Sequence, residues 1–317
     1  MKRLRVVVSL ITQDNDYQVE QAIAAEEAAR KLGVDVEVLY ADNDSIQQSQ
    51  QILNNVQCKA ETRPDGIILE PVGATALPQV ARAAAAAGIP WVVLNRQVDY
   101  LRDLRREFKS PIFSVASDHR EIGRIQAQQL ATLLPDGGSV LHVLGPSETD
   151  AGRLRTEGLN ESKPASIQIK TLKGAWTEAS AHKALTGWLR LSTSQQAHVD
   201  VISAQNDAMA AGAKKAFQQF SYEGDGREHW LSLPFVGVDG VPKTGQAWVR
   251  SGMLTATVIA PPLAGTALEM LVHALHSGTT PPECTMIQPQ SFPSLEVLAD
   301  KAKRKPAAQA AKSGGKA

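Results

Sequence analysis

The sequence is poor in the features that define several protein classes. It has only two cysteines among 317 residues, so neither a disulfide framework nor a cysteine-rich zinc site is expected. Aromatic residues make up 5%, and the 33 basic and 33 acidic residues give a formal net charge of +0. This balance argues against a nucleic-acid-binding surface spread over the whole chain. No apolar stretch approaches the roughly 20 residues that span a bilayer, so no membrane insertion is expected.

The N-terminus only partly matches an export signal. Lys2, Arg3 and Arg5 precede the apolar run Val6–Ile11, but that run is short and no small-residue cleavage site follows it. We predict that the run is the first strand. If a leader has been removed, the expected location is the periplasm; if Met1 is the natural start, it is the cytoplasm.

Three apolar runs in the chain end in polar residues. Short apolar runs between helical patterns are typical of buried parallel strands. In an open α/β sheet, ligands bind just beyond the carboxyl ends of such strands. The sequence therefore predicts one polar, concave ligand site, and no nucleophile–base pair or metal cluster accompanies it. The runs are Ile89–Leu94 before Asn95, Arg96 and Gln97, Val201–Ala204 before Gln205, Asn206 and Asp207, and Phe235–Val238 before Asp239.

Strands alternate with helices along most of the chain, and this alternation predicts parallel sheets with right-handed crossovers. The pattern runs through the first hundred residues, starts again near Phe113, and so predicts two α/β lobes. Expected strands include Val6–Ile11, Val36–Tyr40, Gly66–Leu69, Ile89–Leu94, Phe113–Val115, Ser139–Leu144, Val199–Ala204, Leu254–Ile259 and Met286–Pro289; expected helices include Val19–Leu32, Ser45–Val56 and Ala76–Ala87.

Several short motifs resemble those of the type I periplasmic sugar-binding proteins, the ribose-binding-protein-like group of ABC transporter solute-binding proteins. Each motif is weak alone, but their order and spacing together are specific. The motifs are N-D-Y-Q at 15–18, D-G-I-I-L-E-P at 65–71, G-I-P-W-V-V-L-N-R-Q at 88–97, V-A-S-D at 115–118, R-L-R-T-E-G at 153–158, Q-N-D-A-M-A-A-G-A at 205–213 and G-V-D-G at 237–240.

The resemblance implies an α/β fold of two doubly wound parallel-sheet lobes joined by a three-crossing hinge, the periplasmic binding protein-like I fold, with a sugar in the cleft. The N-terminal lobe is then expected to be 1–116 plus 261–284, and the C-terminal lobe 117–260 plus 285–297. Residues 298–317, rich in Lys and Ala, are expected to be a disordered basic tail. The hinges are expected near Ser117, Ala260 and Cys284.

The resemblance also implies a set of ligand-binding residues. Aromatic rings stack on the apolar face of a sugar. Amide and carboxylate oxygens accept from its hydroxyls, and guanidinium groups donate to them. The family's contacts fall on the rings of Tyr17 and Trp176, the acceptors Asn95, Asn206 and Asp239, and the donors Arg96 and Arg155.

The chain departs from the family pattern at several of these positions. The family commonly has an Asp-Arg pair where Asn95-Arg96 stands, and often a second aromatic residue where Gln18 stands. Two arginines against one aspartate suggest the hypothesis that the ligand, a sugar or polyol, has an acidic group. Asp207 is expected to cap the helix that follows it rather than to join the site.

The leading interpretation is a non-catalytic solute-binding protein that closes on a sugar and presents the closed form to an ABC permease or to a sensor. The alternative is a cytoplasmic ligand-sensing module related to LacI-type effector domains, without a DNA-binding segment. A sugar-processing enzyme is a third possibility. No cofactor is expected, because the sequence has no G-x-G-x-x-G and no G-x-x-x-x-G-K-[ST] motif. No metal is expected, because the histidines lack zinc-like spacing.

Overall fold

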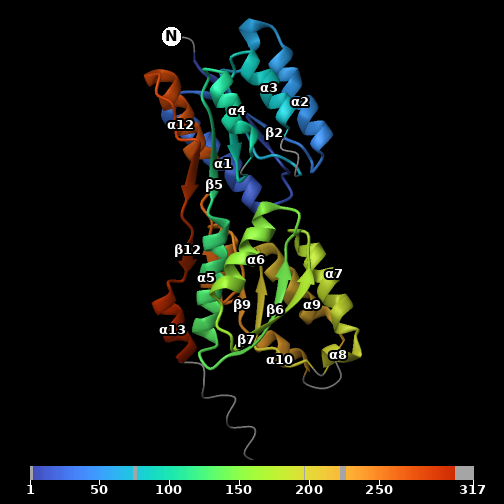
Figure 1. Ribbon diagram of the computed structural model, residues 1–317. Helices are drawn as coiled ribbons and strands as arrows, with labels where there is room; N and C mark the ends of the chain where they lie inside the picture. Colours follow the sequence, from blue (N-terminus) through green and yellow to red (C-terminus); the bar gives the residue numbers. More distant parts are fainter. Residues whose placement is uncertain (1–2, 74–76, 97, 196, 222–225, 304–317) are drawn as a thin grey trace, which may run out of the picture. The chain divides into compact units, whose positions relative to one another are not determined.

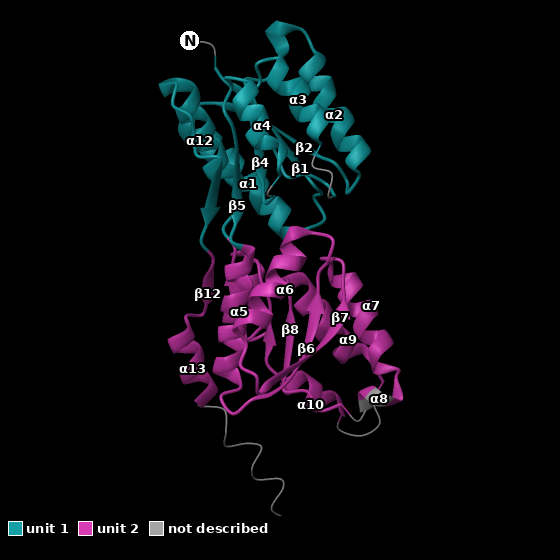
Figure 2. Cartoon of the chain, viewed as in Figure 1, with its two compact units in different colours: residues 1–118, 261–288 teal, residues 119–260, 289–317 magenta. Residues whose placement is uncertain are grey.

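The structure is a computed structural model that describes residues 3–73, 77–96, 98–195, 197–221 and 226–303 (Figure 1). The chain divides into two compact units (Figure 2). Unit 1 comprises the described residues of 1–118 and 261–288, and unit 2 those of 119–260 and from 289 onward. The chain therefore passes from one unit to the other three times.

Unit 1 is built on one parallel sheet whose strand order reverses between β1 and β3. The reversal is the kind of switch point beside which α/β proteins bind ligands. All neighbouring strands are parallel. Their order is β11 (Cys284–Ile287), β5 (Ile112–Ser117), β4 (Trp91–Leu94), β3 (Gly66–Leu69), β1 (Arg5–Leu10) and β2 (Asp35–Tyr40).

Helices cover both faces of this sheet because successive strand side chains point to opposite sides. On β1, Val6 and Val8 pack on the side of α1 (Asp16–Leu32) and α12 (Ala264–Ser277). Val7 packs on the other side. That side is covered by α2 (Ser45–Gln57), α3 (Pro78–Ala86) and α4 (Tyr100–Glu107).

Unit 2 repeats the arrangement on a smaller sheet. Its parallel order is β7 (Ile167–Lys173), β6 (Gly138–Leu144), β8 (Val201–Ala204) and β9 (Phe235–Val236), so the reversal falls between β6 and β8. A separate antiparallel pair joins β10 (Thr257–Ile259) to β12 (Gln290–Phe292).

The helices of unit 2 also form two layers. One hydrophobic cluster includes residues of α5 (His119–Leu133), α6 (Asp150–Ser162) and α13 (Leu295–Lys303). The opposite cluster includes residues of α7 (Glu178–Leu189), α9 (Asp207–Gln219), α10 (Gly226–Ser232) and α11 (Gly245–Arg250). The short α8 (Ser192–Gln195) follows α7. Within the described part of the chain, no helix has the length and apolar character needed to cross a membrane.

Several sequence predictions differ from this fold. The first crossing follows residue 118 rather than residue 116. The third crossing follows residue 288 rather than Cys284, because Cys284–Ile287 pairs with β5 inside unit 1. The tail predicted from residue 298 is wrong as far as 303, because these residues belong to α13, whose Leu298 is fully buried. Residues 304–317 lie outside the described residues. Helix α4 was missed, because its sequence is dominated by charged residues and buries only Leu101 and Leu104.

His142, inside the unit 2 sheet, predicts a pH dependence of stability. Its Nδ1 lies 2.9 Å from Ser203 Oγ, and burial lowers its pKa from 6.5 to about 4. The unfolded chain therefore binds the proton more tightly than the folded chain does. The contribution of neutral His142 to the free energy of unfolding is present above pH 6.5 and is lost as the pH falls toward 4. Protonation is expected to cost up to about 3 kcal/mol.

The substitution His142→Asn is expected to flatten this pH dependence in denaturant unfolding. The matched control is His273→Gln, because His273 is exposed. Equal slopes of stability against pH in wild type and His142→Asn would contradict the prediction.

Candidate functional site

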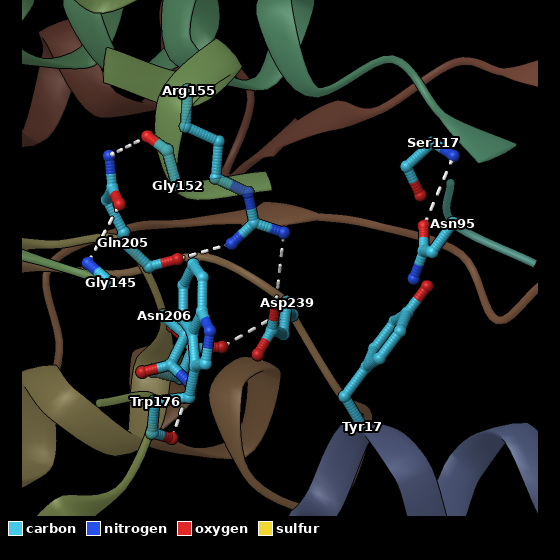
Figure 3. A network of polar contacts seen from close by, with 12 residues as sticks. Tyr17, Asn95, Ser117, Gly145, Gly152, Arg155, Trp176, Gln205, Asn206 and Asp239 are labelled. Carbon is cyan, nitrogen blue, oxygen red and sulfur yellow. Dashed lines mark hydrogen bonds and ion pairs between the residues drawn. The ribbon is translucent and has the colours of Figure 1, made fainter. Parts of the chain in front are cut away.

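Arg155 is the central cation of a buried cluster in unit 2 (Figure 3). It lies on α6 and is only 6% exposed. Its Nη1 donates to the carbonyl oxygen of Gln205, and its Nη2 lies 3.6 Å from Asp239 Oδ1. Its guanidinium carbon lies 5.5 Å from the centre of the Trp176 ring, within cation–π range. These contacts join three predicted ligand residues in one group.

Close packing of α5 against α6 determines where Arg155 lies. A Cβ atom at Gly123 of α5 would be 2.1 Å from the carbonyl oxygen of Arg155, and one at Gly158 of α6 would be 2.0 Å from that of Arg120. The two glycines therefore let the helix backbones touch at two points. Ion pairs of Arg120 with Glu157 and Glu161 join the exposed edges of the same helices.

Asn206 is held by the protein on both sides of its amide. Its Oδ1 accepts from the Met209 N–H at 2.9 Å, which makes Asn206 the N-cap of α9. Its Nδ2 donates to the Trp176 carbonyl oxygen at 2.9 Å. The prediction that Asp207 caps this helix is therefore wrong: Asp207 is the first helical residue, and the cap precedes it.

Gln205 is a buried connector that joins three segments of unit 2. Its Oε1 accepts from the Gly145 N–H at 2.8 Å, at the end of β6. Its Nε2 donates to Thr156 Oγ1 at 2.8 Å and to the Gly152 carbonyl oxygen at 3.2 Å, both on α6. Gln205 thus attaches the Arg155 helix to the switch point between β6 and β8.

Trp176 adopts a backbone conformation that is rare for a large side chain. Its φ is +64°, in the left-handed region that costs a non-glycine residue free energy. The ring lies against Gly145, where a Cβ atom would be only 2.2 Å from a ring carbon. Both features place the ring beside Arg155.

Unit 1 has its own buried polar network, centred on Glu70. This carboxylate, 7% exposed, follows β3 directly. Its Oε1 accepts from Asn95 Nδ2 at 3.1 Å, and its Oε2 accepts from Gln18 Nε2 at 2.9 Å. Asn95 Oδ1 in turn accepts from the Ser117 N–H at 3.4 Å (Figure 3). The network therefore links the ends of β3, β4 and β5 to the start of α1.

Helix α1 begins where it does because Asn15 caps it, accepting from the N–H groups of Tyr17 and Gln18. This places Tyr17 in the first turn, 9% exposed, with its hydroxyl donating to the Pro261 carbonyl oxygen at 3.2 Å. Gln21, one turn later, accepts from the N–H of Leu263 at 2.7 Å. Helix α1 thus holds the segment that follows the second crossing.

Three of the predicted ligand residues have a positive φ. Among the described residues, Asn95, Trp176 and Asp239 have φ values of +58°, +64° and +100°. Such conformations persist only where the surroundings enforce them, and they are common at ligand sites. Because Asp42, Asn43 and Leu77 also have positive φ values, this backbone feature agrees with the choice of the three ligand residues but does not by itself identify them.

A family model described as the periplasmic binding protein domain matches residues 6–280. The chain belongs to this family. Each of its two α/β units contains a parallel sheet whose strand order reverses, and this arrangement is consistent with that membership.

Relatives of this binding protein include two curated bacterial proteins. A putative rhizopine-binding protein of Rhizobium meliloti is 30% identical over 202 residues, which are 61% of this chain and 60% of that protein. A ribose import binding protein of Salmonella typhimurium is 28% identical over 261 residues, 81% of this chain and 79% of that protein. The solved Caulobacter myo-inositol binding protein, bound to myo-inositol, has a TM-score of 0.76 and 23% identity over 94% of this chain and 96% of its own.

The predicted site residues fall into two groups within this binding protein. Unit 2 brings Arg155, Trp176, Asn206 and Asp239 together by direct contacts. In unit 1, Asn95 and Gln18 both donate to Glu70, and Gln18 adjoins Tyr17 in α1. Arg96 follows Asn95, is half-buried, and forms no ion pair with the residues that the structure describes. Gln97 lies outside those residues.

Sequence reasoning missed Glu70 and the connecting role of Gln205. Both follow apolar strands, so the rule that selected Asn95 and Asp239 applied to them as well. Their roles depend on partners distant in sequence, such as Asn95 for Glu70 and Gly145 for Gln205. Across the described ranges, no group of three or more His, Cys, Asp or Glu side chains could hold a metal ion.

Proposed function

We propose that this chain is a non-catalytic solute-binding protein for a neutral sugar or polyol. The observation that supports it most is the Arg155–Asp239–Trp176 cluster, which combines a donor fork, a charged acceptor and an aromatic ring in one buried group. Sugars need these three kinds of contact. Relatives named for ribose and rhizopine binding, and a neighbour bound to myo-inositol, support the same ligand class.

Closure on the ligand is part of this proposal. Side chains from both units are proposed to bind one sugar molecule, which stabilises the closed form because it contacts both. An ABC permease is the proposed reader of the closed form, since one relative is named as an import binding protein. The proposed location is the periplasm, as the family description suggests.

The charge inventory favours a neutral ligand over an acidic one. The acidic hypothesis rested on two arginines against one aspartate, and that count omitted Glu70. Arg155 already lies beside Asp239, and the buried Glu70 carboxylate hydrogen-bonds the residue next to Arg96. With Glu70 included, the candidate site has two cations and two anions, so a ligand with its own negative charge meets no net positive charge there.

Thermal-shift and calorimetric titration with D-ribose, D-galactose, myo-inositol, a sugar acid and a sugar phosphate tests the proposal. A neutral ligand at about a hundred times its dissociation constant is expected to stabilise the chain by about 2.7 kcal/mol. Stabilisation by the acidic compounds alone would refute the neutral class, and no stabilisation by any of them would refute sugar binding. Recovery of a chemically altered sugar would refute the non-catalytic part.

Glu70→Gln is expected to weaken binding of the neutral ligand by about tenfold to a hundredfold. The new amide keeps the shape of Glu70 but presents an N–H group to either Gln18 Nε2 or Asn95 Nδ2, both of which are donors. The same change is expected to improve the affinity for a sugar acid relative to a neutral sugar, because it removes a buried negative charge.

Glu107→Gln is the matched control for this variant. Glu107 ends α4 in the same unit and pairs with Arg82 at the surface, with 48% of its side chain exposed. The affinity of Glu107→Gln for the neutral sugar is expected to equal that of wild type. If Glu70→Gln also bound like wild type, Glu70 would have no role in the site.

A further inference from the structure

Asp207 joins the start of α9 to both sides of the turn that contains Asp239. The carboxyl is buried, with the residue 4% exposed. Its Oδ2 accepts from the Gly240 N–H at 2.8 Å, and the Asp207 backbone N–H donates to the Val238 carbonyl oxygen at 2.7 Å. The residues on either side of Asp239 are therefore both bonded to one residue of the helix.

Two glycines make the space that this carboxyl fills. A Cβ atom at Gly237 would lie 2.2 Å from Asp207 Oδ1, and one at Gly245 would lie 1.9 Å from Oδ2. Neither approach is compatible with a side chain at those positions. The carboxyl therefore sits between two backbone segments, one after β9 and one at the start of α11.

The turn needs such a constraint because its conformation is costly. Asp239 has a φ of +100° and Gly240 a φ of +57°, and the first of these values is unfavourable for a residue with a side chain. We propose that Asp207 is a positioning residue of the ligand site: its carboxyl holds the Asp239–Gly240 turn in the left-handed conformation that directs the Asp239 carboxylate toward Arg155. The effect on ligand affinity rests on the proposed function, whereas the effect on the turn does not.

Because Asp207 can ionise, it is expected to make sugar affinity depend on pH, which an uncharged residue in the same place would not do. Burial, and next the Asp239 carboxylate, raise the pKa of Asp207 well above its usual value, while Thr257, the Gly240 N–H and Arg155 oppose the rise. Asp239 and Arg155 are the charged groups that act on it, from the turn after β9 and from α6. Thr257 on β10 and Gly245 on α11 have no charge.

The direction of the pH effect follows from this arrangement. A pKa raised in the folded state means that the protonated form is stabilised by folding, and this stabilisation is lost as the pH rises through the folded-state pKa. Ionised Asp207 would place a second negative charge beside Asp239, and both would compete for Arg155. Sugar affinity is therefore expected to fall as the pH rises through that pKa.

Asp207→Asn and Asp207→Ala separate the two effects. Asparagine keeps an oxygen for the Gly240 N–H but has no charge. The sugar affinity of this variant is expected to lie within about twofold of the wild-type value at mildly acidic pH. Unlike that of wild type, it is not expected to fall as the pH rises. Alanine removes the acceptor and is expected to bind roughly tenfold more weakly. The probe is whichever of D-ribose, D-galactose and myo-inositol gives the largest thermal shift with wild type.

Asp150→Asn is the matched control. Asp150 is likewise the first helical residue after an N-cap, in α6, but it pairs with Arg153 and keeps 31% of its side chain exposed. The control is expected to keep both the affinity and the pH profile of wild type. A pH profile of Asp207→Asn that matches wild type would overturn the proposal.

Crystal structures of the two variants test the turn without a ligand. Asp207→Asn is expected to retain the positive φ at Asp239 and its approach to Arg155, and Asp207→Ala is expected to lose both. Retention of both in Asp207→Ala would overturn the proposal. If Asp207→Ala does not fold, the test is the pH dependence of thermal unfolding of Asp207→Asn. A pH dependence equal to that of wild type would contradict the proposal. If wild type binds no sugar, the proposed function fails and the structures still decide the role of Asp207.

Discussion

Replacing Arg155 with alanine is expected to weaken sugar binding about a hundredfold or more, because the loss of one partner from a buried charge pair leaves the other uncompensated. Asp239, whose side chain is 14% exposed, would lose its nearby cation. The Gln205 carbonyl oxygen would lose a charge-assisted donor, and the Trp176 ring would lose its cation contact. Isothermal titration calorimetry measures the change.

Arg153→Ala supplies a control on the same helix. Arg153 lies two residues from Arg155, but half of its side chain is exposed, and its ion pairs with Asp150 and Glu157 lie on the surface. Such pairs contribute little, so its affinity is expected to stay within about twofold of wild type. Arg155→Lys keeps the charge but not the planar fork, and an intermediate affinity is expected. Equal affinities of Arg155→Ala and Arg153→Ala would remove Arg155 from the site.

Gly158→Ala is expected to lower the free energy of unfolding by about 3 kcal/mol or more, the largest loss of stability among the variants proposed. The new methyl group would lie 2.0 Å from the Arg120 carbonyl oxygen. Neither backbone can yield easily, because Gly123 makes the reciprocal contact with Arg155 on the same pair of helices. Relief of the overlap requires α6 to move away from α5, and that movement displaces Arg155. Denaturant unfolding measures the stability, and titration measures the accompanying loss of affinity.

Gly187→Ala is the corresponding control, also in a helix of unit 2. Apart from its two chain neighbours and the nearby backbone of its own helix, no atom lies within 4 Å of the Cβ atom that it would add. Alanine is the better helix former, so this variant is expected to be more stable by about 0.5–1 kcal/mol. A Gly158→Ala protein as stable as wild type would show that α5 and α6 can separate without cost.

Local sequence patterns predicted much of the fold because apolar runs and helix signals act over short distances. Strand Gly66–Leu69 has the bounds that its apolar run indicated. Helix α1 begins earlier than its apolar periodicity indicated, at Asp16, because the Asn15 cap decides its start. Helix α4 had no such pattern, since its two buried leucines are surrounded by charged residues.

The candidate site was less predictable because the roles of its residues depend on partners. The motifs selected Arg155 and Asp239, and the structure joins them. Nothing in the local sequence distinguishes Asp207 as a helix cap from Asp207 as a buried partner of Gly240, more than thirty positions away. Likewise, the substitutions at Gln18 and Asn95 become understandable only with Glu70 between them, because two amides can both donate to one carboxylate.

The sequence by itself determined the alternation of strands and helices and the polar residues at the strand ends, because each depends on neighbours within a few positions along the chain. It also determined the family, because the order and spacing of the motifs along the chain are specific. Tertiary structure alone decided which carboxyl groups share a cation, which amide is used for a helix cap and where the third crossing falls. Those outcomes depend on distances and burial between segments far apart in sequence, and charge and hydrogen-bond energies change steeply with both.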